Sequence, residues 1–441
     1  MRPDPGSAAP PESAQLRREV GTFGAVMMGL GSIIGTGVFV SIGIAAGITG
    51  PSVVLAVVIG AVVATFNGLS SAQLAANHPV SGGTYEYGYR YLNSWFGFLA
   101  GWLFLLAKSA SAATAALGFA GYALALVGRR EGGEVVPLAL ALVAVLTLTV
   151  LAGIRRSNRA NIVIVSVTLA SLAFFVLAGL PGAVREGLTN FVPFFAPEEG
   201  RGPLSALLYA SALMFVAYTG YGRIATLGEE VREPRTTIPR AIIAALVVVA
   251  VVYILVSLVG VGEAGAAVLA AVRNRAAPLE HVARDFGFGW APHVLAIGAI
   301  TAMVGVLLNL ILGLSRVLLA MGRRRDVPAV FGRLDPTGST PSAAVIAVGV
   351  VIAVLAATGN VRTTWSFSAF TVLVYYAITN LAALRLPSEA RYYPRWVAAA
   401  GLVSCLLLAF FVERRIWHFG VGLVGVGLLW QAVARRLRSE A

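Results

Sequence analysis

Gly31-Ser32-Ile33-Ile34-Gly35-Thr36-Gly37 interrupts the first long apolar segment of the chain, which covers roughly residues 21–48. Three glycines and two hydroxyl side chains are poor helix formers. In a bilayer, an unwound backbone is tolerated only where it faces protein or a water-filled cavity. The stretch therefore predicts a helix broken near mid-membrane, whose free N–H and C=O groups can hold an ion or a zwitterion.

A second stretch of the same kind, Ala217-Tyr218-Thr219-Gly220-Tyr221-Gly222, lies in the apolar segment 204–227. Each break starts about 14 or 15 residues into its segment, and each segment opens a block of five apolar segments. Because five is odd, the second block must be inverted relative to the first. A small-residue packing face explains one such run, but two at matching positions favour a transporter with inverted repeats.

The composition predicts an all-α polytopic membrane protein. Of the 441 residues, 58% are hydrophobic and only 12% are charged, whereas soluble domains carry about 25% charged residues. A membrane-spanning helix needs about 20 mostly apolar residues. On that rule we predict twelve transmembrane helices, at roughly 21–48, 51–77, 95–127, 135–153, 161–180, 204–227, 240–262, 289–320, 342–358, 363–384, 395–412 and 416–434.

The distribution of basic residues predicts the orientation. Two thirds of the 33 Lys and Arg residues fall in segments on the same side as the N-terminus, so both termini are expected in the cytoplasm of a cell-membrane protein. The polar first twenty residues lack an apolar core, so no cleavable signal peptide is expected. The predicted parts are a tail (1–20), a core (21–385) with repeats at about 21–180 and 204–384, two further helices (386–434) and a second tail (435–441).

Lys108 is the only lysine and lies about 13 residues into the segment 95–127, too deep for its stem to reach the interface. A charge at that depth is costly, and no acidic residue of the predicted core lies there to pair with it. Hydroxyl residues surround it in sequence, Ser111 among them. Three interpretations remain open: a proton-binding coupling group, a counter-charge for a substrate carboxylate, or a static cation that holds hydroxyls and carbonyls.

The remaining reactive side chains predict neither an enzyme nor a metal or cofactor site. Cys405 is the only cysteine, and the histidines His78, His281, His293 and His418 fall in loops or near segment ends. They form no Ser/His/Asp, Cys/His or metal-binding set in the sequence. The net charge of +13 is spread over short loops, which fits membrane orientation and not nucleic-acid binding.

On these stretches the chain resembles the amino acid–polyamine–organocation superfamily of secondary transporters, over about residues 20–385. Residues 31–39, which end Gly37-Val38-Phe39, look like the signature of that family's first helix. The segment 215–222 with the following residues Glu229-Glu230 and Pro234 to Ala241 is similar to its sixth helix and inner loop. Ser315-Arg316 through Asp326-Val327-Pro328 is similar to its segment after helix 8.

The resemblance implies the inverted-repeat fold of the bacterial sodium-coupled leucine transporter, with broken helices 1 and 6 and two extra C-terminal helices. It also implies a carboxylate bound by backbone N–H groups at the first break, an amine bound by carbonyls at the second, and an aromatic gate. The residues it assigns to the substrate are Ile33, Gly35, Thr36 and Gly37 at the first break, and Val216, Ala217, Tyr218, Gly220 and the gate Tyr221 at the second.

Two departures from the resemblance bear on ion coupling. Residues 302–309 contain no Ser or Thr where sodium-coupled relatives have hydroxyls, so a sodium site made of oxygen ligands is not expected. Some proton-coupled relatives carry a lysine in helix 5, where this chain has Thr168. Our hypothesis is that Lys108, with Ser111 beside it, has taken over that coupling role from another helix.

The sequence thus predicts a secondary transporter for amino acids that works by alternating access in the plasma membrane, coupled to protons or acting as an exchanger. Neutral amino acids are favoured, since no acidic side chain is expected at membrane depth, where a polyamine would need one. The alternatives are a transporter of an anionic amino acid or organic acid that uses Lys108 as counter-charge, and, from other classes, a non-transporting amino-acid sensor or a channel.

Overall fold

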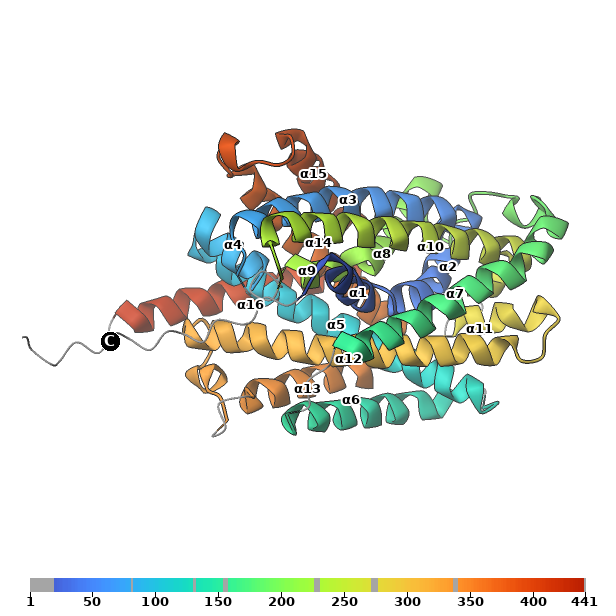
Figure 1. Cartoon of the computed structure of the whole chain (residues 1–441), viewed down its shortest axis with the longest axis horizontal. Helices are drawn as coiled ribbons and strands as arrows, with labels where there is room; N and C mark the ends of the chain where they lie inside the picture. Colours follow the sequence, from blue (N-terminus) through green and yellow to red (C-terminus); the bar gives the residue numbers. More distant parts are fainter. Residues whose placement is uncertain are drawn as a thin grey trace, which may run out of the picture.

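The computed structural model describes residues 20–80, 82–129, 132–153, 158–225, 231–270, 277–335 and 340–439. Nearly all of the predicted tail 1–20, and Glu229-Glu230 of the inner loop, lie outside these ranges. Within them the chain is helical, and its only extended pairing is an isolated bridge between Val20 and Val231. Most of the long helices run roughly along the longest axis of the molecule, side by side (Figure 1).

The first half of the described chain contains two helices separated by a break, a short helix and four long ones. These are α1 (Thr22–Ile33), α2 (Ile42–Thr49), α3 (Val53–Asn77), α4 (Thr84–Tyr91), α5 (Ser94–Leu126), α6 (Val135–Leu151) and α7 (Asn158–Glu186). The second half contains α8 (Pro203–Tyr218), α9 (Gly222–Ala225), α10 (Pro234–Ala270), α11 (Pro278–Val282), α12 (Ala291–Arg323), α13 (Ser342–Ala357), α14 (Val361–Leu384), α15 (Arg395–Phe411) and α16 (Arg414–Ser439).

The apolar composition of these helices fits a membrane protein. Eight described helical stretches are long and apolar enough to cross a bilayer, and three shorter apolar helices accompany them. Every one of the twelve predicted segments coincides with one of these helices or with part of a longer stretch. The prediction of an all-helical polytopic protein is therefore confirmed, whereas the number of crossings and the inverted repeat stay predictions.

Helix α5 forms the centre of the bundle and carries Lys108. It packs against α12, α14, α4, α6 and α13, and the small residues from Ala107 to Ala116 are buried. Small side chains allow neighbouring helix backbones to approach closely. Apolar side chains on the outer faces of α7, α10, α15 and α16 are exposed instead, for example Leu177, Val247, Leu406 and Leu429. These faces are the ones that lipid would cover.

Candidate functional site

The first predicted break is an extended interruption. Helix α1 ends at Ile33, and Ile34 has φ −78° and ψ 111°, outside the helical region. The chain becomes helical again in a π-turn over Gly37–Ser41, which continues into α2. The N–H groups of Val38 and Phe39 both donate to Gly35 O, at 3.2 and 3.1 Å, but the described residues offer no acceptor to the Gly35 N–H. The break thus leaves a backbone donor free at the start of the second half-helix, where the helix dipole is positive.

The second predicted break is compact. Helix α8 ends at Tyr218, a 3₁₀ turn covers Thr219–Tyr221, and α9 follows at once. Thr219 has φ −76° and ψ 7°, so the chain is tightened here and not extended. Two of its carbonyls already accept side-chain hydroxyls: Val216 O accepts from Thr219 Oγ1 at 2.8 Å. Thr219 O accepts from Tyr376 of α14 at 3.2 Å. The second stretch is therefore a tightened turn, and side-chain hydroxyls satisfy two of its carbonyls.

The two breaks lie against each other. A Cβ atom built on Gly220 would fall 2.2 Å from Ser32 O and 2.6 Å from Ile33 N, and one built on Gly37 would fall 2.5 Å from the Ala217 Cβ. Tyr253 of α10 bridges them, because its hydroxyl lies 3.1 Å from Ile33 O and 3.3 Å from Ala217 O. A hydroxyl has one proton, so it donates to one of these carbonyls at a time.

Lys108 reaches the second break. Its Nζ donates to Thr219 Oγ1 at 2.8 Å, and its side chain is buried. Among the described residues it forms no ion pair. One turn further along α5, Ser111 Oγ shares a hydrogen bond of 2.7 Å with Ser368 Oγ of α14. The lysine therefore holds the tight turn through a hydroxyl, one of the partner types that its isolation in the sequence predicted.

One hydroxyl group at the first break has no partner among the described residues. Thr36 Oγ1 is buried and accepts or donates no hydrogen bond there. A buried polar group without a partner costs about 1–3 kcal/mol, so such groups call for an explanation. The Gly35 N–H at the first break is likewise unused among the described residues. A polar ligand bound at the break would satisfy groups of this kind.

The other predicted site residues take varied positions. Tyr218 is buried and its hydroxyl donates to Val57 O of α3 at 3.2 Å, away from the first break. The ring of Tyr221 lies 5.4 Å from that of Tyr376. Sequence reasoning missed Tyr253 and Tyr376. The signal that could have identified them is that a tyrosine within an apolar helix needs a hydrogen-bond partner for its hydroxyl.

Charged and phenolic side chains pack where α4 meets the end of α12. Tyr85 and Tyr89 both donate to Asp326 Oδ2 at 2.7 Å. Arg324 pairs with Glu86 at 2.5 Å, and its guanidinium lies 4.4 Å from the centre of the Tyr89 ring. Since α4 lies in the loop between the second and third predicted membrane segments, this cluster connects that loop to the end of α12.

The comparisons with known proteins agree on one kind of protein. The amino acid permease family model matches residues 24–435. An uncharacterized transporter of Mycobacterium tuberculosis is 40% identical over 427 residues, which cover 97% of this chain and 93% of that protein. The branched-chain amino acid permease of Bacillus subtilis is 30% identical over 367 residues, 79% of this chain and 76% of its own. The methylthioribose transporter of the same species is 26% identical over 446 residues, 96% and 94% of the two chains.

Proposed function

We propose, because this chain belongs to the amino acid permease family, that it moves an amino acid across the plasma membrane through a site between its two helix breaks. Two observations support this most: the two breaks lie against each other, and the Gly35 N–H and the Thr36 hydroxyl of the first break have no partner among the described residues. A membrane-embedded binding site at discontinuous helices is the usual design of secondary transporters.

The proposed binding mode follows from the polarity of the two breaks. The substrate carboxylate accepts from the Gly35 N–H and from Thr36 Oγ1, with Ile33 and Gly37 as the flanking backbone. A carboxylate gains there from both hydrogen bonds and the positive helix end. The substrate amine donates to the carbonyls around Val216, Ala217 and Tyr218, next to Gly220, after Tyr253 releases Ala217 O. Tyr221 covers the bound molecule.

We further propose twelve crossings in two inverted five-helix repeats plus two C-terminal helices, with both termini cytoplasmic. Support comes from the match between the predicted segments and the helices, and from the basic residues of the predicted inner loops. Alternating access means that polar contacts at the two ends open in turn. The Tyr85–Tyr89–Asp326 contacts are the proposed closure at the cytoplasmic end.

Lys108 is the proposed coupling group. A protonated lysine makes a charge-assisted hydrogen bond to Thr219 Oγ1, which is about twice as strong as a neutral one. Loss of the proton weakens that bond, so protonation sets how firmly α5 holds the second break. Burial away from water disfavours the charged form of a lysine, which makes such exchange accessible. The absence of Ser and Thr from residues 302–309 argues for protons over sodium.

The same lysine supports a second candidate function. Among the described residues Lys108 forms no ion pair, and an anionic substrate would supply the missing negative charge. In that case the ligand is an acidic amino acid or an organic acid. Lys108 then acts in substrate recognition and not in coupling.

Uptake by purified protein in liposomes tests these proposals. Radiolabelled L-leucine, L-glutamate and L-arginine are offered, with methylthioribose as a non-amino-acid competitor. We expect L-leucine uptake that a proton gradient accelerates and a sodium gradient does not. Trans-stimulation by unlabelled substrate separates a carrier from a channel. Binding without any flux would instead indicate a sensor, and thermal stabilisation by one member of the panel identifies the ligand.

The variants Lys108→Met and Lys108→Arg decide the role of the lysine. If Lys108 is the coupling group, the Lys108→Met protein still exchanges leucine, but a proton gradient no longer accelerates its uptake. The Lys108→Arg protein, whose side chain stays charged, shows neither leucine exchange nor gradient-driven uptake. For a counter-charge, Lys108→Met loses only L-glutamate uptake. Unchanged uptake and pH profile in both variants would remove both functional roles and leave a static cation.

A further inference from the structure

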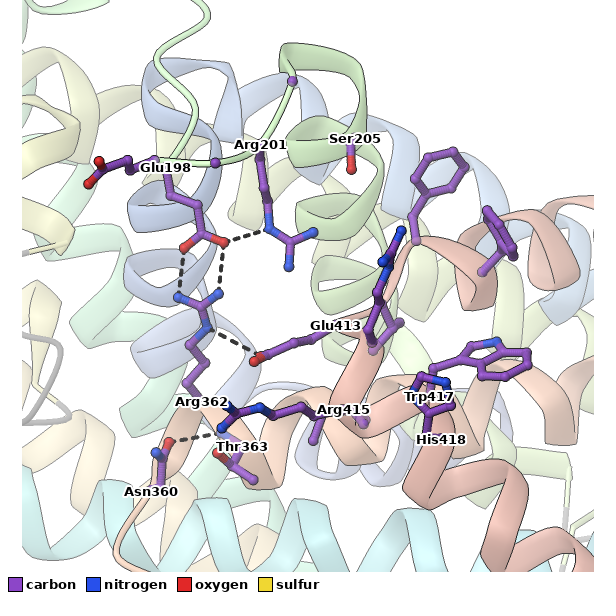
Figure 2. Close-up of a pocket in the computed structure, with 18 residues that line it drawn as sticks. Glu198, Arg201, Ser205, Asn360, Arg362, Thr363, Glu413, Arg415, Trp417 and His418 are labelled. Atoms are coloured by element: carbon purple, nitrogen blue, oxygen red, sulfur yellow. Dashed lines mark hydrogen bonds and ion pairs between the residues drawn. The ribbon is translucent and has the colours of Figure 1, made fainter.

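A cavity of about 1490 Å³ opens where α8, α14 and α16 begin (Figure 2). Its wall includes Ser205 of α8, and Thr219 of the second break follows 14 residues later, roughly 21 Å along that helix. The cavity is therefore separate from the proposed transport site. Its polar wall is formed by the side chains of Glu198, Arg201, Arg362, Glu413, Arg414 and Arg415.

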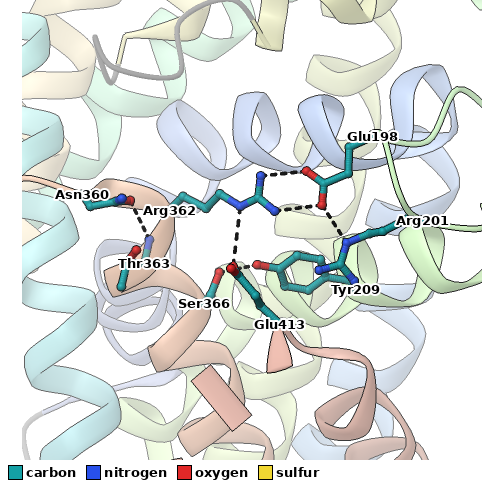
Figure 3. Close-up of polar contacts among 8 residues, drawn as sticks. All are labelled: Glu198, Arg201, Tyr209, Asn360, Arg362, Thr363, Ser366 and Glu413. Carbon is teal, nitrogen blue, oxygen red and sulfur yellow. Dashed lines mark hydrogen bonds and ion pairs between the residues drawn. The ribbon is translucent and has the colours of Figure 1, made fainter. Parts of the chain in front are cut away.

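Two arginines in this wall already hold a carboxylate. Arg362 donates from both terminal nitrogens to the two oxygens of Glu198, each at 2.8 Å. Arg201 Nε donates to Glu198 Oε1 at 2.6 Å (Figure 3). A guanidinium that grips both oxygens of a carboxylate is geometrically specific for that group. The cavity wall thus contains a preformed carboxylate receptor, which the side chain of Glu198 occupies.

The receptor is held in place by contacts other than Glu198. The Tyr209 ring lies 4.7 Å from the Arg201 guanidinium and 5.8 Å from that of Arg362. The Tyr209 hydroxyl shares a hydrogen bond of 2.6 Å with Ser366 Oγ. Arg362 Nε also lies 3.9 Å from Glu413. Because aromatic stacking and this second carboxylate orient the guanidinium groups, the two arginines keep their arrangement when the Glu198 side chain moves away.

Four arginines and three glutamates line the cavity, so its formal charge is +1. Arg414 and Arg415 at the start of α16 are exposed, and within the described part of the chain they form no ion pair. Phe410, Phe411 and Trp417 add apolar side chains to the lining. Cationic and apolar surfaces that face one cavity match a small molecule with a carboxylate and an apolar side chain.

Glu198 belongs to a short segment, residues 194–198, that we call the strap and that connects the broken first helix to this cavity. The Glu198 N–H donates to Ile48 O of α2 at 2.9 Å, and the Ala196 N–H donates to Thr49 O at 3.4 Å. At the start of α3, the Ser52 N–H donates to Phe194 O at 2.9 Å. The strap, residues 194–198, therefore connects α2 to Arg362 of α14 through one carboxylate. A ligand that takes Glu198 off the arginines breaks that connection.

We propose that this cavity is a second binding site, in which the carboxylate of an apolar amino acid replaces Glu198 on Arg362 and Arg201. The amino-acid identity of the ligand rests on the proposed function, whereas recognition of a carboxylate rests on the arginine geometry alone. By our topology the site lies on the outer face, so it receives the ligand before transport and releases the strap that holds α2.

Glu198 is ionised near neutral pH, which makes it a competitor for the incoming carboxylate. Burial alone would raise the pKa of its carboxyl, but hydrogen bonds and charge from Arg362 and Arg201 outweigh burial and lower the pKa. Since the neutral amide of glutamine competes far less well for guanidinium groups, Glu198→Gln should tighten ligand binding. A purely structural salt bridge gives no such gain.

Trp417 fluorescence in the purified protein tests the proposal with L-leucine as probe and leucinamide, which lacks the carboxylate, as control. We expect L-leucine alone to change the emission, and the change to vanish in Trp417→Phe. Glu198→Gln should bind about tenfold more tightly, and Arg362→Gln should lose the response. The matched variant Glu199→Gln alters a carboxylate of the same cavity that holds neither arginine, so its affinity should stay within about twofold.

Unchanged or weaker binding in a folded Glu198→Gln protein, with its melting temperature as the check on folding, would overturn the proposal. So would an undiminished response in Arg362→Gln. The two proposals fail separately. If L-leucine binds at Trp417 but no amino acid is transported, the transport proposal is wrong and the cavity remains a carboxylate site. If uptake occurs without a Trp417 response, only the second site is wrong.

Discussion

The two helix breaks look alike in sequence and differ in structure. The break after α1 extends the backbone at Ile34 and leaves the Gly35 N–H without a partner among the described residues. The break after α8 tightens into a 3₁₀ turn whose carbonyls accept from Thr219, Tyr253 and Tyr376. Both carry glycine, but the backbone is extended only at the first of the two.

The difference assigns separate tasks to the two breaks. A free N–H at a positive helix end binds a carboxylate without first breaking a contact. At the second break, the substrate amine must first displace a tyrosine hydroxyl from a carbonyl. One hydrogen bond then replaces another, so the net gain in binding free energy is small. We infer that the first break supplies affinity for the carboxylate, and that the second break, which Lys108 also touches, changes its contacts when substrate and proton are present.

The largest effect should follow from separating the breaks. In Gly220→Ala the new Cβ would fall within 2.6 Å of backbone atoms of Ser32 and Ile33, which cannot yield as a flexible side chain can. A displacement near 1 Å at a binding site costs about a hundredfold in rate, so leucine uptake should fall by at least that factor. The control is Gly222→Ala, whose Cβ would meet only the Tyr376 hydroxyl, at 3.3 Å. Equal uptake by the two variants would disprove close apposition of the breaks.

A smaller effect should follow from freeing the carbonyls of the second break. Tyr253→Phe removes the hydroxyl that lies between Ile33 O and Ala217 O, so the substrate amine no longer has to displace it. We expect a loss of about 1–3 kcal/mol in stability without ligand. The preference for L-leucine over 4-methylpentanoate, which lacks the amine, should rise several-fold in competition assays.

Tyr122→Phe provides the control for that experiment. The Tyr122 hydroxyl donates to Phe39 O at 2.7 Å, so its loss also uncovers a carbonyl of the first broken helix, but outside the break itself. Stability should fall in a similar way, and the preference for the amine should not change. An equal rise in that preference in both variants would mean that Tyr253 plays no specific part at the breaks.

The sequence predicted most of the fold because helix length and hydrophobicity are local properties. The segment 363–384, for instance, is α14 (Val361–Leu384), and 395–412 is α15 (Arg395–Phe411). Gly35 and Gly220 also predicted the positions of the two breaks. The burial of Lys108 could also be predicted, since a single charged residue in an apolar run stands out in a hydropathy pattern.

The sequence alone could not predict the hydrogen-bond partners at the breaks, because these contacts arise from tertiary packing. Tyr253 lies in an otherwise ordinary apolar segment, and nothing local shows that α10 brings its hydroxyl between Ile33 O and Ala217 O. The tight turn at Thr219 likewise depends on Lys108 of α5 and Tyr376 of α14. Arg362 and Glu198 are 164 residues apart, so their pairing needed the fold.

The smallest predicted effect concerns the unused hydroxyl at the first break, and it has opposite signs with and without ligand. Thr36→Val replaces a buried hydroxyl that has no described partner by a methyl group of similar size. Removal of an unsatisfied polar group should raise stability without ligand by about 1 kcal/mol. The same change removes a donor to the substrate carboxylate, so the thermal shift on adding L-leucine should shrink.

Thr114→Val is the matched control for Thr36→Val. Thr114 Oγ1 is satisfied, with hydrogen bonds to Thr364 Oγ1 at 2.7 Å and to Ala110 O at 2.9 Å, so the same substitution should lower stability there and leave the ligand shift intact. If Thr36→Val destabilised the protein as Thr114→Val does, its hydroxyl would have a partner within the protein. If it kept the full ligand shift, the carboxylate would bind elsewhere. Only the combination of higher intrinsic stability and weaker ligand stabilisation shows a group held in reserve for the substrate.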